Sequence, residues 1–234
     1  GFILDVLKYY TPITSYYKLM KTVQDDPMFD KKRAQKKLRS FVESDSYTIA
    51  QKADMMVEHF HEQVISKGKI GGQARAMVAT SSIPRCIEYY YAISKSLANR
   101  HSPYKAIVAF SGEHKYQEQE LPLTSTAING FPDAKIPSML KSDPYRILVV
   151  ADMFQTGFDE PLLHTMYVDK MLYDIKAVQT LSRLNRCHPQ KHDTFVLDFF
   201  NNPVMIEQAF SRYYRTTLLS GETDPNKLYD LIAT

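Results

Sequence analysis

Five short runs of consecutive apolar residues restrict the fold of this chain more than any other feature of its sequence. The runs span residues 76–79, 106–110, 147–151, 165–168 and 194–197. A strand that is buried on one face alternates apolar and polar residues, whereas a strand buried on both faces is apolar throughout. The runs therefore predict an α/β fold in which helices cover both faces of a parallel sheet.

Amphipathic stretches lie between and beside these runs and predict the covering helices. Apolar residues recur at helical spacing over residues 84–98, 136–141, 174–187 and 203–219. A helical segment also precedes the first run and ends at the stop signal Gly68. We therefore expect a linker at residues 1–30, an N-terminal helical extension at 31–70, the sheet domain at 71–200 and a helical tail leading to a following domain at 201–234.

The composition fits a globular protein, with 44% hydrophobic and 24% charged residues. No apolar run approaches the roughly 20 residues that span a bilayer, so we expect no membrane partner. Cys86 and Cys187 form no CxxC pair, which is typical of a reduced, cytoplasmic protein. Cys187, His188 and His192 lack a fourth ligand nearby, so no metal site is predicted. The net charge of +3 permits a polyanionic partner without requiring one.

Polar residues follow the first two apolar runs at the point where each predicted strand ends. These are Thr80 and Ser81 after the first run, and Ser111 and Gly112 after the second. Ligands of open α/β sheets bind outside the carboxyl ends of the strands, so these positions are candidates for ligand contact. Residues 76–82 and 106–112 resemble motif IV of superfamily 2 helicases and the strand after it, and this resemblance implies that the four residues contact a nucleic-acid backbone. The alternative is that such hydroxyls begin helices, a role that suits Ser82.

Two arginines and a glutamine share one side of the predicted helix at 174–187. Gln179, Arg183 and Arg186 are spaced i, i+4 and i+7, which places them within about 60° of one another. A guanidinium group is always charged and donates in a rigid fork, so two aligned arginines are suited to stabilise charge on a phosphoryl group. From the spacing alone, a surface helix with two extended arginines is the alternative.

This segment, Gln179-Thr-Leu-Ser-Arg-Leu-Asn-Arg186, resembles motif VI of superfamily 2 helicases. It differs from that motif at Ser182 and Asn185, where glycines are usual. The resemblance implies that Arg183 and Arg186 are catalytic arginine fingers. It also implies that Gln179 couples the nucleotide state to the position of the lobe.

Upstream, the run at 147–151 continues into Phe154-Gln-Thr-Gly-Phe-Asp-Glu-Pro161, which resembles motif V. Gly157 allows a tight turn, and the hydroxyl of Thr156 is suited to bind a phosphate. Asp159 is placed to reach a ribose or a partner lobe, and with Gly157 it is a candidate for nucleotide coupling. A strand-to-loop connection with a helix cap is the alternative.

The two motifs in this order, followed by Phe195-Val-Leu-Asp-Phe199, are similar to the motor-endonuclease (R) subunits of type I restriction enzymes, over residues 70–200. The resemblance implies the second (helicase C-terminal) RecA-like lobe of a P-loop-NTPase-type motor. It implies ATP-driven translocation of double-stranded DNA, followed by cleavage in a separate nuclease domain. The implied partners are double-stranded DNA, the first RecA-like lobe of the same chain, and the modification and specificity subunits.

No phosphate-cradling Gly-x-x-x-x-Gly-Lys-Ser/Thr loop occurs in the sequence. Gly68-Lys69 lacks both the upstream glycine and the following hydroxyl, and no buried strand immediately precedes Asp159-Glu160. We therefore expect that ATP and Mg²⁺ bind mainly to the first lobe, and that this lobe and the nuclease belong to a longer protein. The fragment alone is expected not to hydrolyse ATP.

Two rival functions remain open at this point. The chain is alternatively the second lobe of another superfamily 2 enzyme, such as an RNA helicase or a remodeller, or a RecA-like module that only binds partners. The six basic residues between Lys31 and Arg39 are either a solvated helix face or a nucleic-acid contact.

Overall fold

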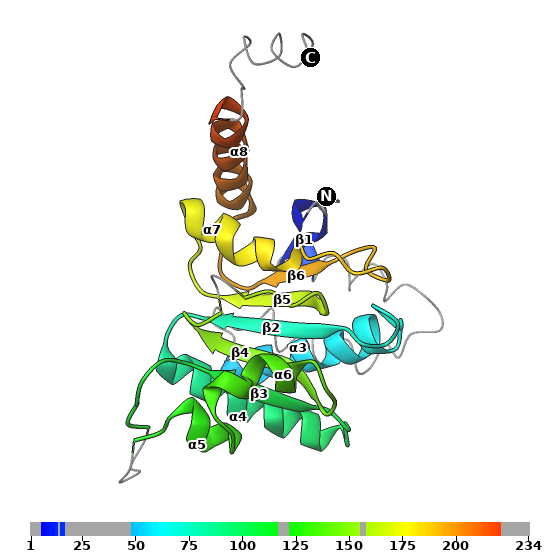
Figure 1. Ribbon diagram of the computed structural model, residues 1–234, viewed down its shortest axis with the longest axis vertical. Coiled ribbons are helices and arrows are strands. Elements are labelled where there is room, and N and C mark those ends of the chain that lie inside the picture. Colours follow the sequence, from blue (N-terminus) through cyan, green and yellow to red (C-terminus); the bar gives the residue numbers. More distant parts are fainter. Residues whose placement is uncertain (1–5, 14, 17–47, 117–121, 155–157, 221–234) are drawn as a thin grey trace, which may run out of the picture.

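A six-stranded parallel sheet forms the centre of the computed structural model, which describes residues 6–13, 15–16, 48–116, 122–154 and 158–220 (Figure 1). The strand order is β1-β6-β5-β2-β4-β3, and each neighbouring pair is parallel. The strands are β1 (Tyr10–Pro12), β2 (Arg75–Thr80), β3 (Lys105–Ala109), β4 (Tyr145–Ala151), β5 (Leu163–Asp169) and β6 (Phe195–Asp198). The predicted α/β class is confirmed.

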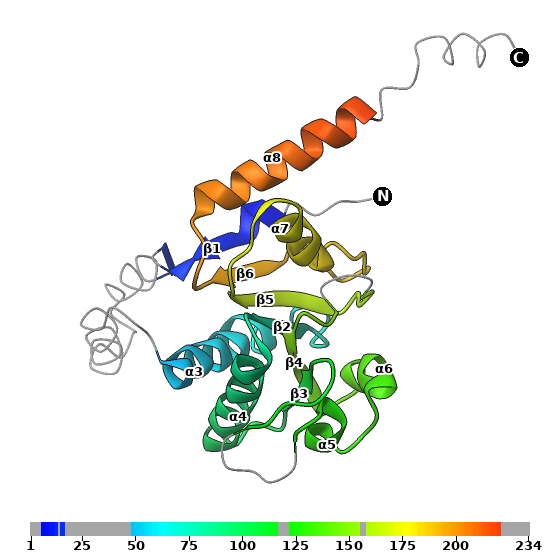
Figure 2. The same cartoon turned by 90° about the vertical axis from the view of Figure 1, so that its left-hand side faces the viewer.

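Helices cover both faces of this sheet (Figure 2). On one face lie α3 (Ile49–His59), which continues as the π-helix η2 (Phe60–Ile65), and α4 (Ile83–Asn99). On the other lie α6 (Ile136–Leu140), α7 (Asp174–Leu181) and α8 (Pro203–Ser220). The short elements are η1 (Val6–Tyr9), α5 (Ser125–Asn129), η3 (Asp133–Lys135) and η4 (Ser182–Leu184).

Alternation along each strand divides the core into two clusters. Successive side chains of a strand point to opposite faces, so Val78 packs on the α3 and α4 side while Met77 packs on the other. Both side chains are fully buried. Burial on both faces explains why the strands appear in the sequence as unbroken apolar runs.

A short segment near the N-terminus forms a strand that the sequence did not predict. Tyr10–Pro12 lies in the stretch predicted as a linker, yet it pairs with β6 as the edge strand β1. The Tyr10 hydroxyl donates to Asp198 Oδ2 at 2.7 Å, which fixes this strand to the end of β6. The sheet therefore extends beyond the predicted bounds of 71–200.

The helix predicted at 174–187 ends earlier, and this prediction is wrong in its second half. α7 stops at Leu181, a 3-10 turn follows to Leu184, and Asn185 has φ −79° and ψ 56°. The Leu184 carbonyl accepts from Lys191 Nζ at 2.6 Å. Arg183 and Arg186 therefore do not share a regular helical face, and any convergence of their side chains has to come from tertiary contacts.

Some predictions fall outside the described residues. These are the basic stretch at 31–39, Thr156 and Gly157, and residues 221–234 of the predicted tail. Among the helices that the structure does describe, none combines the length and the apolar character of a membrane span.

Candidate functional site

The structure places the predicted site residues at two opposite edges of the sheet. Because the strands are parallel, their starts share one edge, here the amino edge, and their ends share the other, here the carboxyl edge. Ser81, Ser111 and Gly112 follow strands and lie at the carboxyl edge. Asp159 precedes β5, and α7 runs back from the end of β5 toward its start. Figure 1 shows α7 running along the sheet in this direction. Arg183 and Arg186 follow α7 and contact Phe158 and Asp159, so they lie at the amino edge.

At the amino edge, the ends of the two motif-like segments contact each other. We call residues 182–186 the arginine turn. Arg186 Nε pairs with Asp159 Oδ1 at 2.7 Å, and Arg183 Nη1 donates to the Phe158 carbonyl at 3.2 Å. Arg183 Nε also donates to the Gln179 carbonyl at 3.2 Å. Three of the predicted residues, Asp159, Arg183 and Arg186, are thus brought together despite the early end of the helix.

The charges of this cluster favour an anionic ligand. Burial, followed by the neighbouring charge of Arg186, lowers the pKa of Arg183, while the Asp159 carboxylate acts in the opposite direction. Two guanidinium groups at one place concentrate positive charge, and the single carboxylate of Asp159 offsets it in part. The Gln179 side chain is exposed on α7, one helical turn before Arg183.

A buried lysine, Lys191, binds the backbone of the arginine turn. The sequence analysis did not identify this residue. Lys191 Nζ donates to the carbonyl oxygens of Leu163 and Leu184, each at 2.6 Å, and lies 3.5 Å from that of Pro161. Burial lowers the pKa of Lys191 to about 8, and electrostatic interactions with Cys187 and Glu160 oppose this shift. A single lysine in a loop has no spacing pattern, so nothing in the sequence could have marked it.

A second polar cluster lies next to this lysine. Asp193 accepts from His164 Nε2 at 3.0 Å and pairs with Lys69, which precedes β2. Burial lowers the pKa of His164, although the Asp193 carboxylate opposes this shift. The cluster ties the loop before β6 to the loop before β2, so the amino edge is held by charged contacts between segments distant in sequence.

At the carboxyl edge, the predicted contact residues differ from one another. Ser81, Ser111 and Gly112 are exposed, and Gly112 has φ 77°, a conformation that favours glycine. Thr80 is instead fully buried, and its hydroxyl donates to the Val150 carbonyl at 2.9 Å. The prediction that Thr80 grips a phosphate is corrected, because this hydroxyl holds β2 to β4. Ser82 accepts from Arg85 N at 3.4 Å as the N-cap of α4.

Acidic residues at the ends of β5 and β6 also have structural partners. Asp169 accepts from Lys52 Nζ at 2.7 Å and from the Tyr89 hydroxyl at 2.6 Å, which joins α3 and α4 to β5. Asp198 accepts from the Tyr10 hydroxyl and from the amides of Phe200 and Asn201. Their carboxylates hold secondary-structure elements together. In the part of the chain that the structure describes, no three His, Cys, Asp or Glu side chains gather as a metal site requires.

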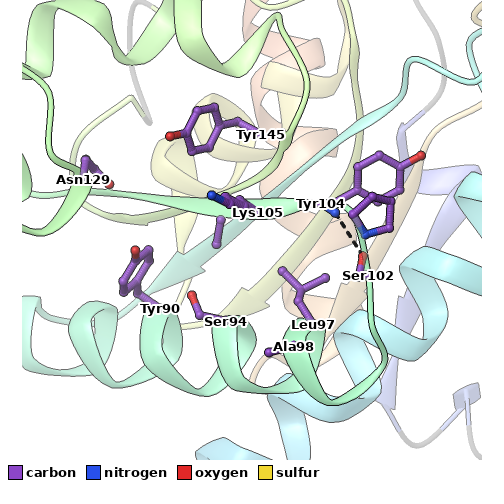
Figure 3. Close-up of a pocket in the computed structure, with 11 residues that line it drawn as sticks. Tyr90, Ser94, Leu97, Ala98, Ser102, Tyr104, Lys105, Asn129 and Tyr145 are labelled. Carbon is purple, nitrogen blue, oxygen red and sulfur yellow. Dashed lines mark hydrogen bonds between the residues drawn. The ribbon is translucent and has the colours of Figure 1, made fainter.

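A cavity of about 440 Å³ lies beside the start of β3, apart from the predicted residues (Figure 3). Tyr90 and Ser94 line it from α4, and Tyr145 lines it from the start of β4. The side chain of Asn129, at its rim, accepts from Val108 N at 3.0 Å and donates to Val108 O at 2.7 Å. Asn129 thus occupies backbone groups of the edge strand β3 that would otherwise be open to another strand.

Residues 133–201 match the family model for domain 3 of the type I restriction enzyme subunit R. The chain is 28% identical over 158 residues to the putative type I restriction enzyme MjaIXP endonuclease subunit of Methanocaldococcus jannaschii, a match covering 68% of this chain and 14% of that protein. It is 26% identical over 160 residues to the type I restriction enzyme HindI endonuclease subunit of Haemophilus influenzae, covering 62% and 14%. The chain thus spans about one seventh of these relatives. The resemblance indicated by the motifs is confirmed.

Solved structures similar to this chain are helicase and ATPase domains. Domain 2 of the DEAD-box helicase Mss116p, bound to an RNA duplex, is 14% identical with a TM-score of 0.43, over 65% of this chain and 51% of that one. The C-terminal part of the Fun30 ATPase domain is 11% identical with a TM-score of 0.43, over 83% and 54%. Likenesses at this level carry no functional argument.

Proposed function

We propose that this chain, a relative of the R subunits of type I restriction enzymes, is the second RecA-like lobe of an ATP-dependent translocase of double-stranded DNA. The observation that carries the proposal is the contact between the two motif-like segments. Asp159 pairs with Arg186, and Phe158 accepts from Arg183, so the ends of both motifs form one cluster at the amino edge. This contact supports a lobe in which both motifs respond to the same nucleotide.

In this proposal Arg183 and Arg186 are arginine fingers. Their guanidinium forks fit phosphate oxygens and stabilise the charge that develops during phosphoryl transfer. ATP and Mg²⁺, which supply that phosphoryl group and its counter-charge, bind mainly to the first lobe of the longer protein. The Arg186 and Asp159 side chains are 34% and 75% exposed, and such surface pairs contribute only about 0–1 kcal/mol. Arg186 can therefore leave Asp159 for a phosphate at little cost.

Gln179, Asp159 and Gly157 are proposed to couple the nucleotide state to the position of the lobe. Asp159 is central to this role, because it loses its partner whenever Arg186 turns to a phosphate. The Gln179 side chain is exposed on α7, one helical turn before Arg183, and is proposed to act beside that arginine. The rearrangement at the amino edge would then move the lobe along the DNA.

The DNA contacts are proposed at Ser81, Ser111, Gly112 and Thr156. Ser81, Ser111 and Gly112 lie at the carboxyl edge. Hydroxyl and backbone N–H groups position a protein on the phosphate backbone and read no bases. Sequence recognition would therefore come from partner subunits, namely the specificity and modification subunits of a restriction complex. Cleavage belongs to a nuclease domain of the longer protein.

The test is an ATPase assay of the full-length protein with duplex DNA and, separately, with single-stranded RNA. We expect stimulation by duplex DNA, and no turnover above a buffer blank from the purified 234-residue chain alone. Stimulation by RNA only would identify another class of superfamily 2 motor. No ATPase activity with either nucleic acid would identify a module that only binds partners.

A further inference from the structure

Lys191 is a buried cation whose partners are backbone carbonyl groups. Its residue is only 6% exposed, and its ammonium reaches Leu163 O and Leu184 O at 2.6 Å. Burying an ammonium is costly unless hydrogen-bond acceptors replace the lost water. The carbonyl groups supply these acceptors, and the buried carboxylate of Glu160 adds a favourable charge. A lysine held in this way has a defined place in the fold.

The two closest acceptors of the Lys191 ammonium belong to β5 and to the arginine turn, which the proposed mechanism must hold in a fixed relative position. Leu163 is the first residue of β5, four residues after Asp159, and Leu184 is the last residue of η4, between the two arginines. The Lys191 ammonium thus joins the backbone of the arginine turn to the sheet. It does so beneath the surface, without using the side chain of either arginine.

The surface contacts of the two arginine side chains must break during the proposed catalysis, whereas the buried bonds of Lys191 need not. When the guanidinium group of Arg186 turns to a phosphate it gives up Asp159, and Arg183 gives up the Phe158 carbonyl. The bonds from Lys191 to the backbone are unaffected by either movement. They can keep the turn in place while its side chains exchange partners.

We propose that Lys191 is the positioning residue of the arginine turn, and that its ammonium holds residues 182–186 against the start of β5 while Arg183 and Arg186 act. The expected effect of Lys191 on catalysis rests on the proposed function. Its effect on the structure of the turn does not, since the hydrogen bonds to Leu163 and Leu184 exist in the lobe itself. The two consequences are therefore measured separately.

The structural consequence is measured by hydrogen exchange of the full-length protein. Lys191→Met keeps the apolar stem and removes the donors, so we expect faster exchange in peptides that cover 182–187 and unchanged exchange in β2 and β4. Lys191→Arg keeps a charged donor and should restore most of the protection. Lys52→Met is the matched control, because Lys52 is also a mostly buried lysine but pairs with Asp169. It should leave 182–187 unchanged.

The catalytic consequence is measured by the kcat and KM of the same variants. A shift of about 1 Å in a reacting group can lower a rate by about 100-fold, so Lys191→Met should lose kcat on that scale with little change in KM for ATP. Lys191→Arg should recover most of it. Equal exchange at 182–187 in Lys191→Met and wild type overturns the proposal, as does loosening spread over the whole domain or a loss confined to KM. If no ATPase is found even in the wild type, the proposed function fails, and the exchange experiment still decides whether Lys191 holds the turn.

Discussion

The two edges of the sheet differ in how firmly they hold the residues proposed to act there. At the amino edge, the buried Lys191 binds the backbone of the arginine turn to the start of β5, and weaker contacts join the two arginine side chains to Asp159 and the Phe158 carbonyl. At the carboxyl edge, Ser81 and Ser111 are exposed side chains at strand ends. Groups that stabilise a developing charge must be held in place, whereas groups that touch a phosphate backbone need only be accessible. The difference matches the two roles proposed.

The largest expected effect comes from the arginines of the amino edge. Replacing Arg183 or Arg186 with Lys in the full-length protein should lower DNA-stimulated ATP turnover by about 10³ to 10⁵, because a lysine keeps the charge but loses the fork. Steady-state turnover with saturating duplex DNA measures this. Arg212→Lys, on the exposed face of α8, serves as the control and should leave turnover unchanged. Near-normal turnover of Arg186→Lys would remove that residue from the finger role.

The next largest effect is a loss of stability in acid, which we expect from the buried His59 of α3. Burial, with a smaller contribution from His164, lowers the pKa of His59 to about 3, and the His59 ring bonds to the Tyr167 hydroxyl at 2.8 Å. Between pH 6.5 and 3, His59 is therefore protonated in the unfolded chain and neutral in the folded chain. The free energy of unfolding is unaffected by His59 above pH 6.5 and falls below that pH by up to about 1.4 kcal/mol per pH unit.

Urea unfolding at several pH values measures this slope. His59→Gln keeps a polar partner for Tyr167 and should flatten the dependence between pH 6 and 4. His192→Gln, at an exposed position, controls for the removal of a histidine. An unchanged slope in His59→Gln would show that other groups cause the acid sensitivity.

A smaller effect is expected from Thr80, which is buried at the carboxyl edge and should affect stability, unlike the exposed Ser81 and Ser111. Thr80→Val keeps the shape of the side chain but leaves the Val150 carbonyl without its donor, so the free energy of unfolding should fall by about 1–3 kcal/mol. The affinity of the full-length protein for duplex DNA should not change. Denaturant titration and DNA titration of the same variant test both halves. Weakened DNA binding with unchanged stability would return Thr80 to the DNA contacts.

The smallest effect is expected from the exposed serines. A hydrogen bond from a neutral hydroxyl contributes about 0.5–1.5 kcal/mol, so Ser81→Ala combined with Ser111→Ala should weaken DNA binding only several-fold. The loss should be equal for unrelated duplex sequences, and stability should stay within about 0.5 kcal/mol. Labelled duplexes of different sequence, titrated at several salt concentrations, provide the measurement. Weakening that depends on the DNA sequence would mean that this edge reads bases.

Local composition was enough to predict the parts of this fold that are buried on both faces. Each of the five predicted strands is observed, because a fully covered strand must be apolar along its whole length. The motif-like segments also identified the family resemblance, and Asp159, Arg183 and Arg186 do meet. Asp159, Arg183 and Arg186 nevertheless do not meet because of a shared helical face, which the sequence had predicted for the two arginines. α7 ends at Leu181, before either arginine.

The sequence by itself determined the α/β class, the five strands that are buried on both faces and the residue types that meet at the amino edge. Only the tertiary structure decided that Tyr10–Pro12 becomes a strand, that Thr80 points inward, and that Lys191 holds the arginine turn. Each of these outcomes depends on a partner far away in the chain: β6 for the first, Val150 for the second and Leu163 for the third. Spacing along a sequence reports neighbours within one element, whereas contacts between elements arise only when the core packs.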